Sequence, residues 1–437
     1  METRDRARVA PLTVAALLTV GAALAPSAST VAPDTIAADR FVDAAGVNIH
    51  LHYDNTPYRS QFPLIKRRLI ELGVRHVRDG LVDTTWQGYY DRLNELGAAG
   101  IKGTFVTSPE QSTALWIDYP TRVSHSFEAY EAPNEYDRSN DPDWAQVLTA
   151  TLTHLRKLKS DARVTDFPVY GPSLTSENAY ETLGDVSAYF DFANLHNYFA
   201  GRQPSTQGWG ANGFGSIAWN LDLAARHAPG KPVVTTETGY QDSASQVDWV
   251  PADVAGRYMP IVLLEQFRAG IVRTFLYELI DFPKSGSYGL LEQDGSPKPA
   301  FTAVKGLLSL LADPGPAFTP QRLQYTIGDE RGNVRHLAFQ KRDGTYFLAL
   351  WLPRPSYDLS TGTRITVAAQ RVEVTLPSAE RRLRTHEWQT AGAVSTTPWS
   401  TPGETIPVAV ADRLVVIELA QSAPAAPGNL RVVSDKP

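Results

Sequence analysis

The chain has 437 residues, and none of them is a cysteine. Disulfides, thiolate metal sites, a thiol nucleophile and a lipoprotein anchor are therefore excluded, so the core alone must stabilise the fold. With 43% hydrophobic residues, the chain can form one large core and one smaller core, because single cores stop growing beyond roughly 250 to 300 residues. We therefore expect two domains.

An excess of positive charge is also lacking. The chain carries 41 Lys and Arg against 47 Asp and Glu, for a net charge of −6, and its basic residues are spread along the sequence. Proteins that bind nucleic acid present a basic patch or stripe. We therefore expect no nucleic-acid partner.

Several catalytic signatures are missing. The chain contains no G-x-S-x-G nucleophile elbow, no P-loop, no dinucleotide-binding glycine pattern and no H-E-x-x-H. These absences exclude the esterase, kinase, dehydrogenase and zinc-protease classes that depend on them. We expect no cofactor and no metal.

The N-terminal apolar stretch is short. It runs from Ala10 to Ala25, follows three arginines and ends in small residues through Ser29. This pattern is typical of a cleaved secretory signal, so we predict a signal peptide over residues 1–29 and a secreted protein that leaves the membrane. The alternative is an uncleaved anchor, which a stretch shorter than the ~20 residues of a spanning helix disfavours.

From residue 44 to 312 the sequence alternates β-rich apolar runs with amphipathic stretches. The runs predicted as strands are 47–52, 74–78, 102–107, 127–131, 168–171, 192–196, 232–236 and 272–277. Helical periodicity is clear over 62–72, 144–158, 254–267 and 300–311. Eight strand-then-helix units predict an α/β fold, a (β/α)8 TIM barrel over residues 36–312, with a doubly wound open sheet as the alternative.

After residue 312 the pattern changes to short strands separated by turn residues. Examples are 336–339, 345–351, 365–367, 372–376 and 414–419. Such spacing predicts a C-terminal antiparallel β-sandwich over residues 313–420. Residues 421–437 are rich in Pro and Ala and are expected to be a disordered tail.

Polar residues stand at the carboxyl ends of the predicted strands, where the loops of a barrel build the active site. Asn134-Glu135 follows the fourth strand, His196-Asn197-Tyr198 ends the sixth, and Glu237 follows the seventh. A glycosidase needs two carboxyl groups, one to protonate the leaving oxygen and one to attack or stabilise the anomeric carbon. Glu131 is a rival to Glu135, but strand alternation and the neighbouring Asn134 favour Glu135.

This arrangement resembles the clan A glycoside hydrolases, barrel enzymes with Asn-Glu after strand four and Glu after strand seven. The likeness covers roughly residues 44 to 312. It implies that Glu135 is the acid/base, that Glu237 is the nucleophile and that Asn134 contacts the sugar hydroxyl next to the anomeric carbon. The chain departs from many members at strand eight, where it has Tyr277-Glu278 in place of Trp.

A nucleophile must stay ionised, which a cation and hydrogen-bond donors favour. Arg78 and Tyr198 are the candidates for these donors to Glu237. His196 and Asn197 are expected to orient Glu135, Tyr198 or the sugar. Structural alternatives remain open, because His196 could be only a hydrogen-bonded wall residue and Arg78 could pair with Asp79 or Glu131.

Further candidate substrate contacts lie on the first and eighth strands. His50 and His52 point to the same barrel face, and a metal role is disfavoured because no third ligand has suitable spacing. Tyr277 and Glu278 end the eighth strand, where Glu278 binds substrate or pairs with Arg273. Sugar rings stack on flat aromatic side chains, and the tryptophans in presumed loops are Trp86, Trp116, Trp209 and Trp249.

Trp86 and Trp209 are included among the expected substrate contacts. The prediction is a secreted retaining glycoside hydrolase that acts by double displacement on a β-linked oligosaccharide, polysaccharide or glycoside. Retention requires the carboxyl groups to be ~5 to 5.5 Å apart, whereas ~6.5 to 9.5 Å indicates inversion. Two alternatives stay open, namely a barrel that binds glycan without cleaving it and a transglycosidase that uses the same residues. Galactosides, glucosides, mannosides, xylosides and arabinofuranosides all remain possible substrates, and the oligomeric state is not specified.

Overall fold

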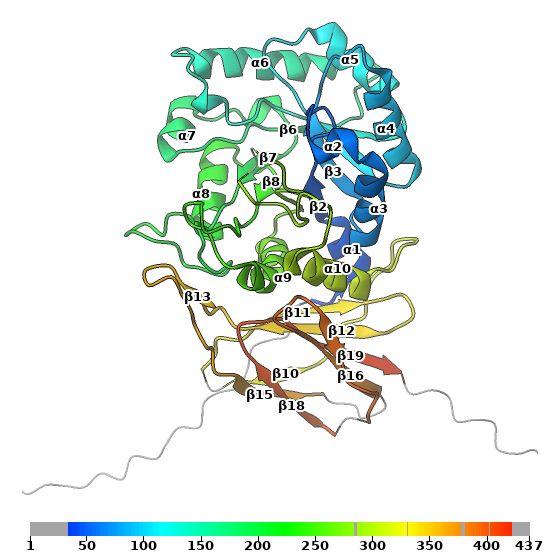
Figure 1. The fold of residues 1–437 in the computed structure, drawn as a ribbon, viewed down its shortest axis with the longest axis vertical. Coiled ribbons are helices and arrows are strands. Elements are labelled where there is room, and N and C mark those ends of the chain that lie inside the picture. The colour runs from blue at the N-terminus through cyan, green and yellow to red at the C-terminus, as the bar shows by residue number, and fades with distance from the viewer. Residues whose placement is uncertain (1–33, 284–285, 330, 377–380, 402, 422–437) are drawn as a thin grey trace, which may run out of the picture.

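The computed structural model describes residues 34–283, 286–329, 331–376, 381–401 and 403–421 (Figure 1). The predicted signal peptide lies outside the described residues, and so does the predicted tail apart from Gln421. In the part of the chain that the structure describes, no helix has both the length and the apolarity that a bilayer crossing needs.

Eight parallel strands form one sheet in the order β6-β5-β4-β3-β2-β9-β8-β7. Their bounds are β2 (Ala45–Asn48), β3 (His76–Gly80), β4 (Lys102–Val106), β5 (Phe127–Glu131), β6 (Val169–Tyr170), β7 (Ala193–His196), β8 (Val233–Thr238) and β9 (Arg273–Leu276). A parallel bridge between Tyr170 and Phe192 joins the two end strands, and the Gly171 amide donates to the Phe192 carbonyl at 2.8 Å. The sheet is therefore closed, which confirms the predicted TIM barrel and excludes the open sheet.

Helices surround this sheet (Figure 1). They are α1 (Ala38–Asp43), α2 (Pro57–Ser60), α3 (Phe62–Leu72), α4 (Gln87–Ala98), α5 (Thr113–Arg122), α6 (Trp144–Leu158), α7 (Glu177–Leu183), α8 (Ile217–His227), α9 (Ala252–Arg268) and α10 (Pro299–Leu311). The amphipathic pattern located α3 and α6 to the residue. In α3, Ile65, Leu69 and Leu72 are buried on one face, and the helix ends at Gly73, whose φ of 84° is left-handed.

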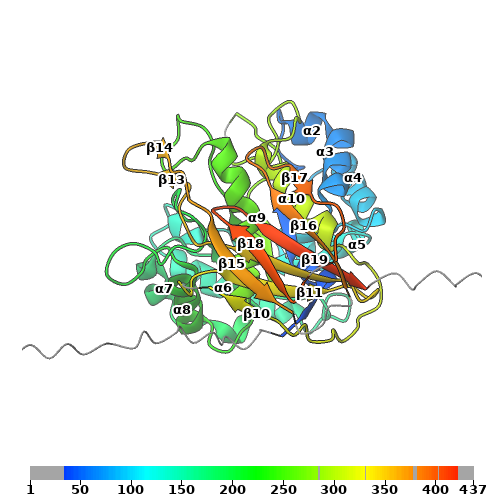
Figure 2. The ribbon, with the colours of Figure 1, turned by 90° about the horizontal axis from the view of Figure 1, so that it is seen from below.

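The C-terminal domain consists of two principal sheets, which are antiparallel, as predicted, apart from the edge strand β1. The larger has the order β1-β11-β12-β19-β16-β17 and the smaller β10-β15-β18. Their bounds are β1 (Ile36–Ala37), β10 (Thr326–Gly328), β11 (Arg335–Gln340), β12 (Tyr346–Trp351), β15 (Gln370–Thr375), β16 (Arg381–Trp388), β17 (Val394–Thr396), β18 (Thr405–Val410) and β19 (Val415–Gln421). The smaller sheet lies on the side away from the barrel (Figures 1 and 2). A separate hairpin comprises β13 (Tyr357–Asp358) and β14 (Thr363–Arg364).

Two short segments differ from the predictions. Residues 36–37 were expected to begin the barrel, but Ile36 pairs in parallel with Phe339 of β11, so β1 is an edge strand of the sandwich. Residues 365–367 were expected to be a strand, but β14 ends at Arg364. Whether a segment this short forms a strand, and in which sheet, depends on the strand with which it pairs, and sequence periodicity does not identify that partner.

The barrel and the sandwich share a core. Helices α9 and α10 lie between them (Figure 1), and the fully buried Trp351 of β12 donates its indole N–H to Glu265 of α9 at 2.7 Å. Trp388 of β16 donates in the same way to the Ala303 carbonyl of α10 at 2.9 Å. The sandwich thus packs on the barrel's helices, while its hairpin β13–β14 reaches a loop that follows β8, where the ring centroids of Tyr357 and Trp249 lie 5.7 Å apart.

Candidate active site

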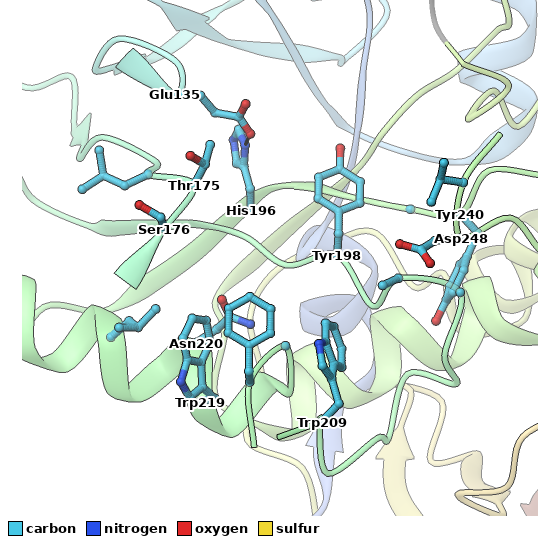
Figure 3. A pocket seen from close by; sticks show the side chains of 18 of the residues that line it. Glu135, Thr175, Ser176, His196, Tyr198, Trp209, Trp219, Asn220, Tyr240 and Asp248 are labelled. Carbon is cyan, nitrogen blue, oxygen red and sulfur yellow. Dashed lines mark hydrogen bonds and ion pairs between the residues drawn. The ribbon is translucent and has the colours of Figure 1, made fainter. Parts of the chain in front are cut away.

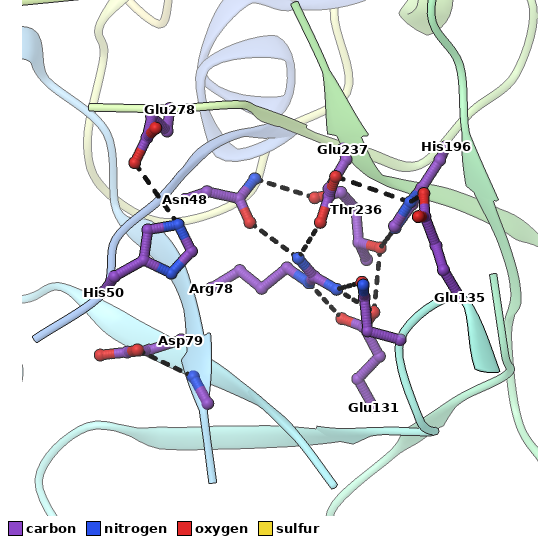
Figure 4. A network of polar contacts seen from close by, with 12 residues as sticks. Asn48, His50, Arg78, Asp79, Glu131, Glu135, His196, Thr236, Glu237 and Glu278 are labelled. Atoms are coloured by element: carbon purple, nitrogen blue, oxygen red, sulfur yellow. Dashed lines mark hydrogen bonds and ion pairs between the residues drawn. The ribbon is translucent and has the colours of Figure 1, made fainter. Parts of the chain in front are cut away.

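Glu135 follows β5 at a sharp change in chain direction. Its backbone has φ 41° and ψ 42°, and the short 3-10 helix η1 (Tyr136–Arg138) begins directly after it. A non-glycine residue in this left-handed region is uncommon, and such residues cluster at functional sites. The turn directs the Glu135 carboxylate toward His196 of β7 (Figure 4).

Glu237 of β8 lies across the same opening, and its side chain is 11% exposed. One carboxylate oxygen accepts a hydrogen bond from Arg78 Nη1 at 2.6 Å, and the other accepts from the Tyr198 hydroxyl at 2.9 Å. Burial and the charge of Glu237 raise the pKa of Tyr198 well above its usual value, so this phenol keeps its proton and donates. Arg78 and Tyr198 therefore occupy the positions predicted for them, one on each oxygen of Glu237.

Arg78 of β3 is the cation of the site. It donates to Glu237, to Asn48 at 3.0 Å, to Asn134 at 2.6 Å and twice to Glu131 at 2.8 Å. Burial lowers the pKa of Arg78, but the two carboxylates outweigh burial and raise the pKa, so the guanidinium stays charged. Arg78 thus makes both the expected contact with the nucleophile candidate and the structural pair with Glu131.

Glu131, the rival carboxylate, is fully buried beneath Arg78. Besides Arg78, it accepts hydrogen bonds from Asn194 at 3.0 Å and from the Thr236 hydroxyl at 3.1 Å. A ligand in the cleft cannot reach it. Glu135, by contrast, lines the larger cleft described below.

His196 stands between the two candidate catalytic carboxylates. Its Nδ1 lies 2.8 Å from Glu135 Oε1 and 3.6 Å from Glu237 Oε2, and its Nε2 lies 3.2 Å from Thr236 Oγ1. Burial raises the pKa of Glu135, but the hydrogen bond shared with His196 and the charges of His196, Arg138 and Arg78 lower it, and the lowering prevails.

Glu135, His196 and Glu237 each offer an atom within 4.8 Å of the others, a spacing at which three ligands could hold a metal ion. Both oxygens of Glu237 already accept hydrogen bonds, from a cation and from a phenol. Such donors suit an ionised nucleophile, whereas a dication would have to displace or oppose Arg78. The two carboxylates thus approach each other without needing a metal between them.

Two clefts meet at this pair. The larger, of about 660 Å³, has Glu135 at its edge, and its lining includes His196, Tyr198, Trp209 and Tyr240 (Figure 3). The smaller, of about 420 Å³, has Glu237 at its edge, and its lining includes Asn48, His50, His52, Arg78, Asn134 and Tyr277. One carboxylate therefore faces each cleft.

The two histidines predicted on the first strand lie in the smaller cleft, but they follow the strand, because β2 ends at Asn48 and the chain turns at residues 51–52. His52 Nδ1 contacts Asp79 at 2.8 Å, while His50 stacks on Tyr53 with ring centroids 4.6 Å apart. Burial, reinforced by the charges of His52 and Arg78, lowers the pKa of His50 well below its usual value, so its ring is neutral. His50 thus presents an uncharged polar edge to the cleft.

Glu278 lies behind His50 and is fully buried. It accepts a hydrogen bond from Tyr58 at 2.8 Å and lies 3.4 Å from His50 Nε2. It lines neither of the two clefts, so the expectation of direct substrate contact is corrected. The alternative pairing with Arg273 is also wrong, because Arg273 binds Glu128 and Asp43 at the other end of the barrel.

Asn197 is a second correction. It is fully buried, and its side chain contacts Thr235 and Gln266 in the barrel wall. His196 and Tyr198 face the opening, and the residue between them faces outward, because side chains alternate along extended backbone. Asn197 therefore does not reach the cleft.

The tryptophans also divide. Trp209 lines the larger cleft, as expected. Trp86 instead lies against Arg59 and Arg92, with their guanidinium carbons 2.9 and 4.8 Å from its ring, and lines neither cleft. Trp116, expected in a loop, is buried inside α5. Trp86 thus packs on two cations outside both clefts, whereas Trp209 borders the larger cleft with one cation, Arg202, 4.0 Å from its ring centroid.

Sequence reasoning missed Asn48, Asn194 and Thr236. Asn48 lies two residues before His50 and four before His52. In the strand predicted over 47–52 all three side chains would point to the same face, and this pattern could have identified Asn48. Thr236 directly precedes Glu237, so simple alternation would place it on the opposite face. However, the pairing of β8 with β7 changes register here, since Leu195 pairs with Thr235 but His196 pairs with Glu237. Such an irregularity re-aims side chains and leaves no mark in the sequence.

No protein-family model matches the chain, and no curated protein matches it. Many solved structures are similar to it, among them the following three. The first is a family 39 glycoside hydrolase from the gut symbiont Bacteroides cellulosilyticus WH2, with 18% identity, a TM-score of 0.55, and coverage of 90% of this chain and 83% of that one.

The second is the family 30 subfamily 8 xylanase Xyn30A from Clostridium acetobutylicum, with 10% identity, a TM-score of 0.55 and coverage of 87% and 96%. The third is the catalytic domain of GH30 xylanase C from Talaromyces cellulolyticus, with 10% identity, a TM-score of 0.51 and coverage of 90% and 99%. At these identities the likeness establishes a shared fold, which is the fold implied by the resemblance to clan A.

Proposed function

We propose that this protein is a secreted retaining glycoside hydrolase that cleaves the O-glycosidic bond of a β-linked glycan or glycoside by double displacement. One observation carries the proposal, namely that one oxygen of Glu135 lies within 4.8 Å of one oxygen of Glu237 at the carboxyl ends of the barrel strands, too close to admit a water and a sugar carbon between them. Retaining enzymes hold their carboxyl groups ~5 to 5.5 Å apart, whereas inverting enzymes need ~6.5 to 9.5 Å to admit a water. The close approach supports retention.

Glu237 is the proposed nucleophile. Hydrogen bonds from Arg78 and Tyr198 to its two oxygens favour the ionised form. In the first step one of these oxygens bonds to the anomeric carbon as the bond to the leaving oxygen breaks. The hydrogen bonds hold the carboxylate at one orientation, which reduces the entropy lost on reaching the transition state.

Glu135 is the proposed acid/base. In the first step it gives its proton to the leaving oxygen. In the second step a water oxygen bonds to the anomeric carbon, the water gives a proton to Glu135, and the ester bond to Glu237 breaks. The protein returns to its starting state, and the sugar keeps its anomeric configuration.

The two clefts support a substrate with a sugar on each side of the cleaved bond. The smaller cleft combines Asn134, Arg78 and the neutral His50 around Glu237, where polar groups can bind the hydroxyls of the cleaved sugar. The larger cleft offers aromatic rings, Trp209 and Trp219 among them, on which sugar faces can stack. The printed names of the similar structures, a glycoside hydrolase and two xylanases, also support a carbohydrate substrate.

Azide rescue of two matched variants tests the proposal. Glu237→Gly should lose almost all turnover, and azide should then enter the vacated space and produce a glycosyl azide of inverted configuration in a single displacement. Glu135→Gly should lose roughly 10²- to 10⁴-fold on poor leaving groups. Its glycosyl-enzyme still forms from an activated aryl glycoside, so azide should give the opposite anomer.

The two products separate the two roles by stereochemistry, which NMR reads directly. Retained turnover in Glu237→Gly would contradict the assignment of Glu237 as the nucleophile. No turnover by the wild-type protein, together with the absence of both azides, would contradict the hydrolase assignment and favour a glycan-binding barrel. N-terminal sequencing of the protein from culture supernatant tests secretion, with cleavage near Ser29 as the expected result. A full-length chain retained in the membrane would contradict it.

A further inference from the structure

The hydroxyl of Thr236 lies directly beneath His196. Thr236 is fully buried. Its Oγ1 lies 3.2 Å from His196 Nε2, 2.9 Å from Asn194 Oδ1 and 3.1 Å from Glu131 Oε1 (Figure 4). It therefore contacts both the buried Glu131 and the imidazole between the two candidate catalytic carboxylates.

The neighbours of this hydroxyl determine where its proton lies. Glu131 accepts two N–H groups from Arg78, as a carboxylate does, and Asn194 donates its amide N–H to Glu131 at 3.0 Å. The Asn194 oxygen therefore faces Thr236. Both partners on this side accept, so the single hydroxyl proton points to one of them and a lone pair faces His196.

This lone pair selects the tautomer of His196. A hydrogen bond between Thr236 and Nε2 then requires a proton on Nε2. A neutral imidazole carries only one proton, so Nδ1 is left with a lone pair. That lone pair faces Glu135 Oε1 at 2.8 Å, where a hydrogen bond needs one further proton, on either atom.

We propose that Glu135 and His196 act as one acid/base unit that holds a single exchangeable proton between Oε1 and Nδ1, and that Thr236 is the positioning residue that imposes this state. The inference rests on the proposed function. The charged groups around the unit are Glu237 from β8, Arg138 next to Glu135, and Arg78 behind Glu237, with Glu131 reached through Thr236.

Glu237 couples this proton to the reaction. Its carboxylate lies 3.6 Å from Nδ1 and attracts the shared proton while it is ionised. When Glu237 bonds to the anomeric carbon it becomes a neutral ester, and this attraction is lost as the leaving oxygen takes the proton from Glu135. When water cleaves the ester, the charge on Glu237 returns as a proton from water enters the unit. Each step thus transfers one proton out of or into the unit, and it forms or breaks one bond to Glu237.

Thr236→Val is the direct test, because it removes the hydroxyl at nearly constant volume. The N–H on Nε2 of His196 then loses its acceptor, so the tautomer with the proton on Nδ1 is favoured. In this tautomer Nδ1 donates a hydrogen bond to an ionised Glu135, and Glu135 has no proton to give to the leaving oxygen. Turnover of alkyl glycosides should fall ~10²-fold, since general-acid catalysis is worth ~10² to 10⁴. Turnover of 2,4-dinitrophenyl glycosides should change only a few-fold, because their leaving group needs no protonation.

Two further variants control the test. Thr236→Ser keeps the hydroxyl and should restore the wild-type ratio between the two substrates. Thr235→Val removes a buried hydroxyl from the same strand, but this hydroxyl donates to Gln266 at 2.8 Å in the barrel wall, and the ratio should stay unchanged. Equal losses on both substrates in Thr236→Val would overturn the proposal.

Nitrogen-15 NMR of the wild-type imidazole gives a second readout that needs no variant. We expect Nε2 of His196 to stay protonated across the active pH range while Nδ1 exchanges its proton. A neutral ring with its proton on Nδ1 would overturn the proposal. Failure of the hydrolase assignment itself looks different, because the wild-type protein would then turn over neither substrate and Glu237→Gly would never yield an azide.

Discussion

Replacing Arg78 with methionine should destabilise the protein more than any surface charge change. Arg78 makes five hydrogen bonds, two of them to the fully buried Glu131 and one to Glu237. Removing one partner of a buried ion pair typically costs about 3 to 5 kcal/mol because the other charge stays buried and uncompensated. Arg78→Met leaves two such carboxylates, so we expect a loss at the upper end, about 5 kcal/mol at neutral pH.

The loss should depend on pH in a known direction. At low pH the stranded carboxylates of the variant bind protons and become neutral, which relieves part of the cost, so the difference from wild type should shrink toward pH 5 and grow toward pH 8. Urea unfolding followed by tryptophan fluorescence measures the free energy of unfolding at both values. Stability within 1 kcal/mol of wild type, or a loss equal at both pH values, would refute the assignment of Arg78 as a buried cation between two carboxylates.

Two variants calibrate this experiment. Arg78→Lys keeps the charge but offers three N–H donors where the guanidinium offers five, so it should lose about 1 to 3 kcal/mol and most of the activity. Arg75→Met removes a nearby arginine whose pair with Asp39 is partly exposed to solvent, with Arg75 28% exposed. Its loss should be about 1 kcal/mol or less.

Two other predictions concern stability in acid and substrate affinity. Burial lowers the pKa of His227 from 6.5 to about 4, so between these two pH values the imidazole binds a proton in the unfolded chain but not in the folded one. The free energy of unfolding should therefore decrease by up to about 3 kcal/mol as the pH falls through this range. His227→Phe should remove that part of the acid loss in urea unfolding at pH 7 and pH 4.5, and an equal loss in both proteins would contradict it. Trp209→Ala should raise KM for an oligosaccharide about tenfold at nearly constant kcat, since aromatic packing is worth ~0.5 to 1.5 kcal/mol. Trp86→Ala is the control, because Trp86 lines neither cleft. Equal effects of the two substitutions on KM would contradict the placement of the cleft.

Strand positions could be predicted because each barrel strand is an apolar run that a helix-length segment separates from the next. Closure of the barrel brings the ends of these strands to one rim, so Glu135, His196 and Glu237 meet although they are far apart in the chain. Alternation also explains why His196 and Tyr198 share a face. The same rule, applied strictly, would have excluded Asn197.

Other features depend on contacts that a linear pattern does not contain. Trp86 is covered by Arg59, 27 positions earlier, and periodicity carries no information about which cation meets which ring. The register change in β8 turns Thr236 and Glu237 toward the same opening. Both features belong to tertiary structure. For this reason the sequence alone did not predict that Glu131, Asn194 and Thr236 lie buried behind the two carboxylates as parts of the site.

The charges of the buried residues behind the two carboxylates bear on the proposed glycoside cleavage. Arg78 is positive, Glu131 and Glu237 are negative, and the unit of Glu135 and His196 is neutral when it holds one proton. Together these residues therefore carry one net negative charge, since Arg138 beside Glu135 is largely exposed to solvent and screened, and Glu237 is the charged carboxylate beside the smaller cleft. Glycoside cleavage develops positive charge at the anomeric carbon in an oxocarbenium-like transition state. A fixed negative charge at that point stabilises the transition state more than the neutral ground state, and only this difference accelerates the reaction. Under the proposed function, Glu131 would thus contribute to catalysis without reaching the cleft, because without its charge Arg78 would cancel that of Glu237.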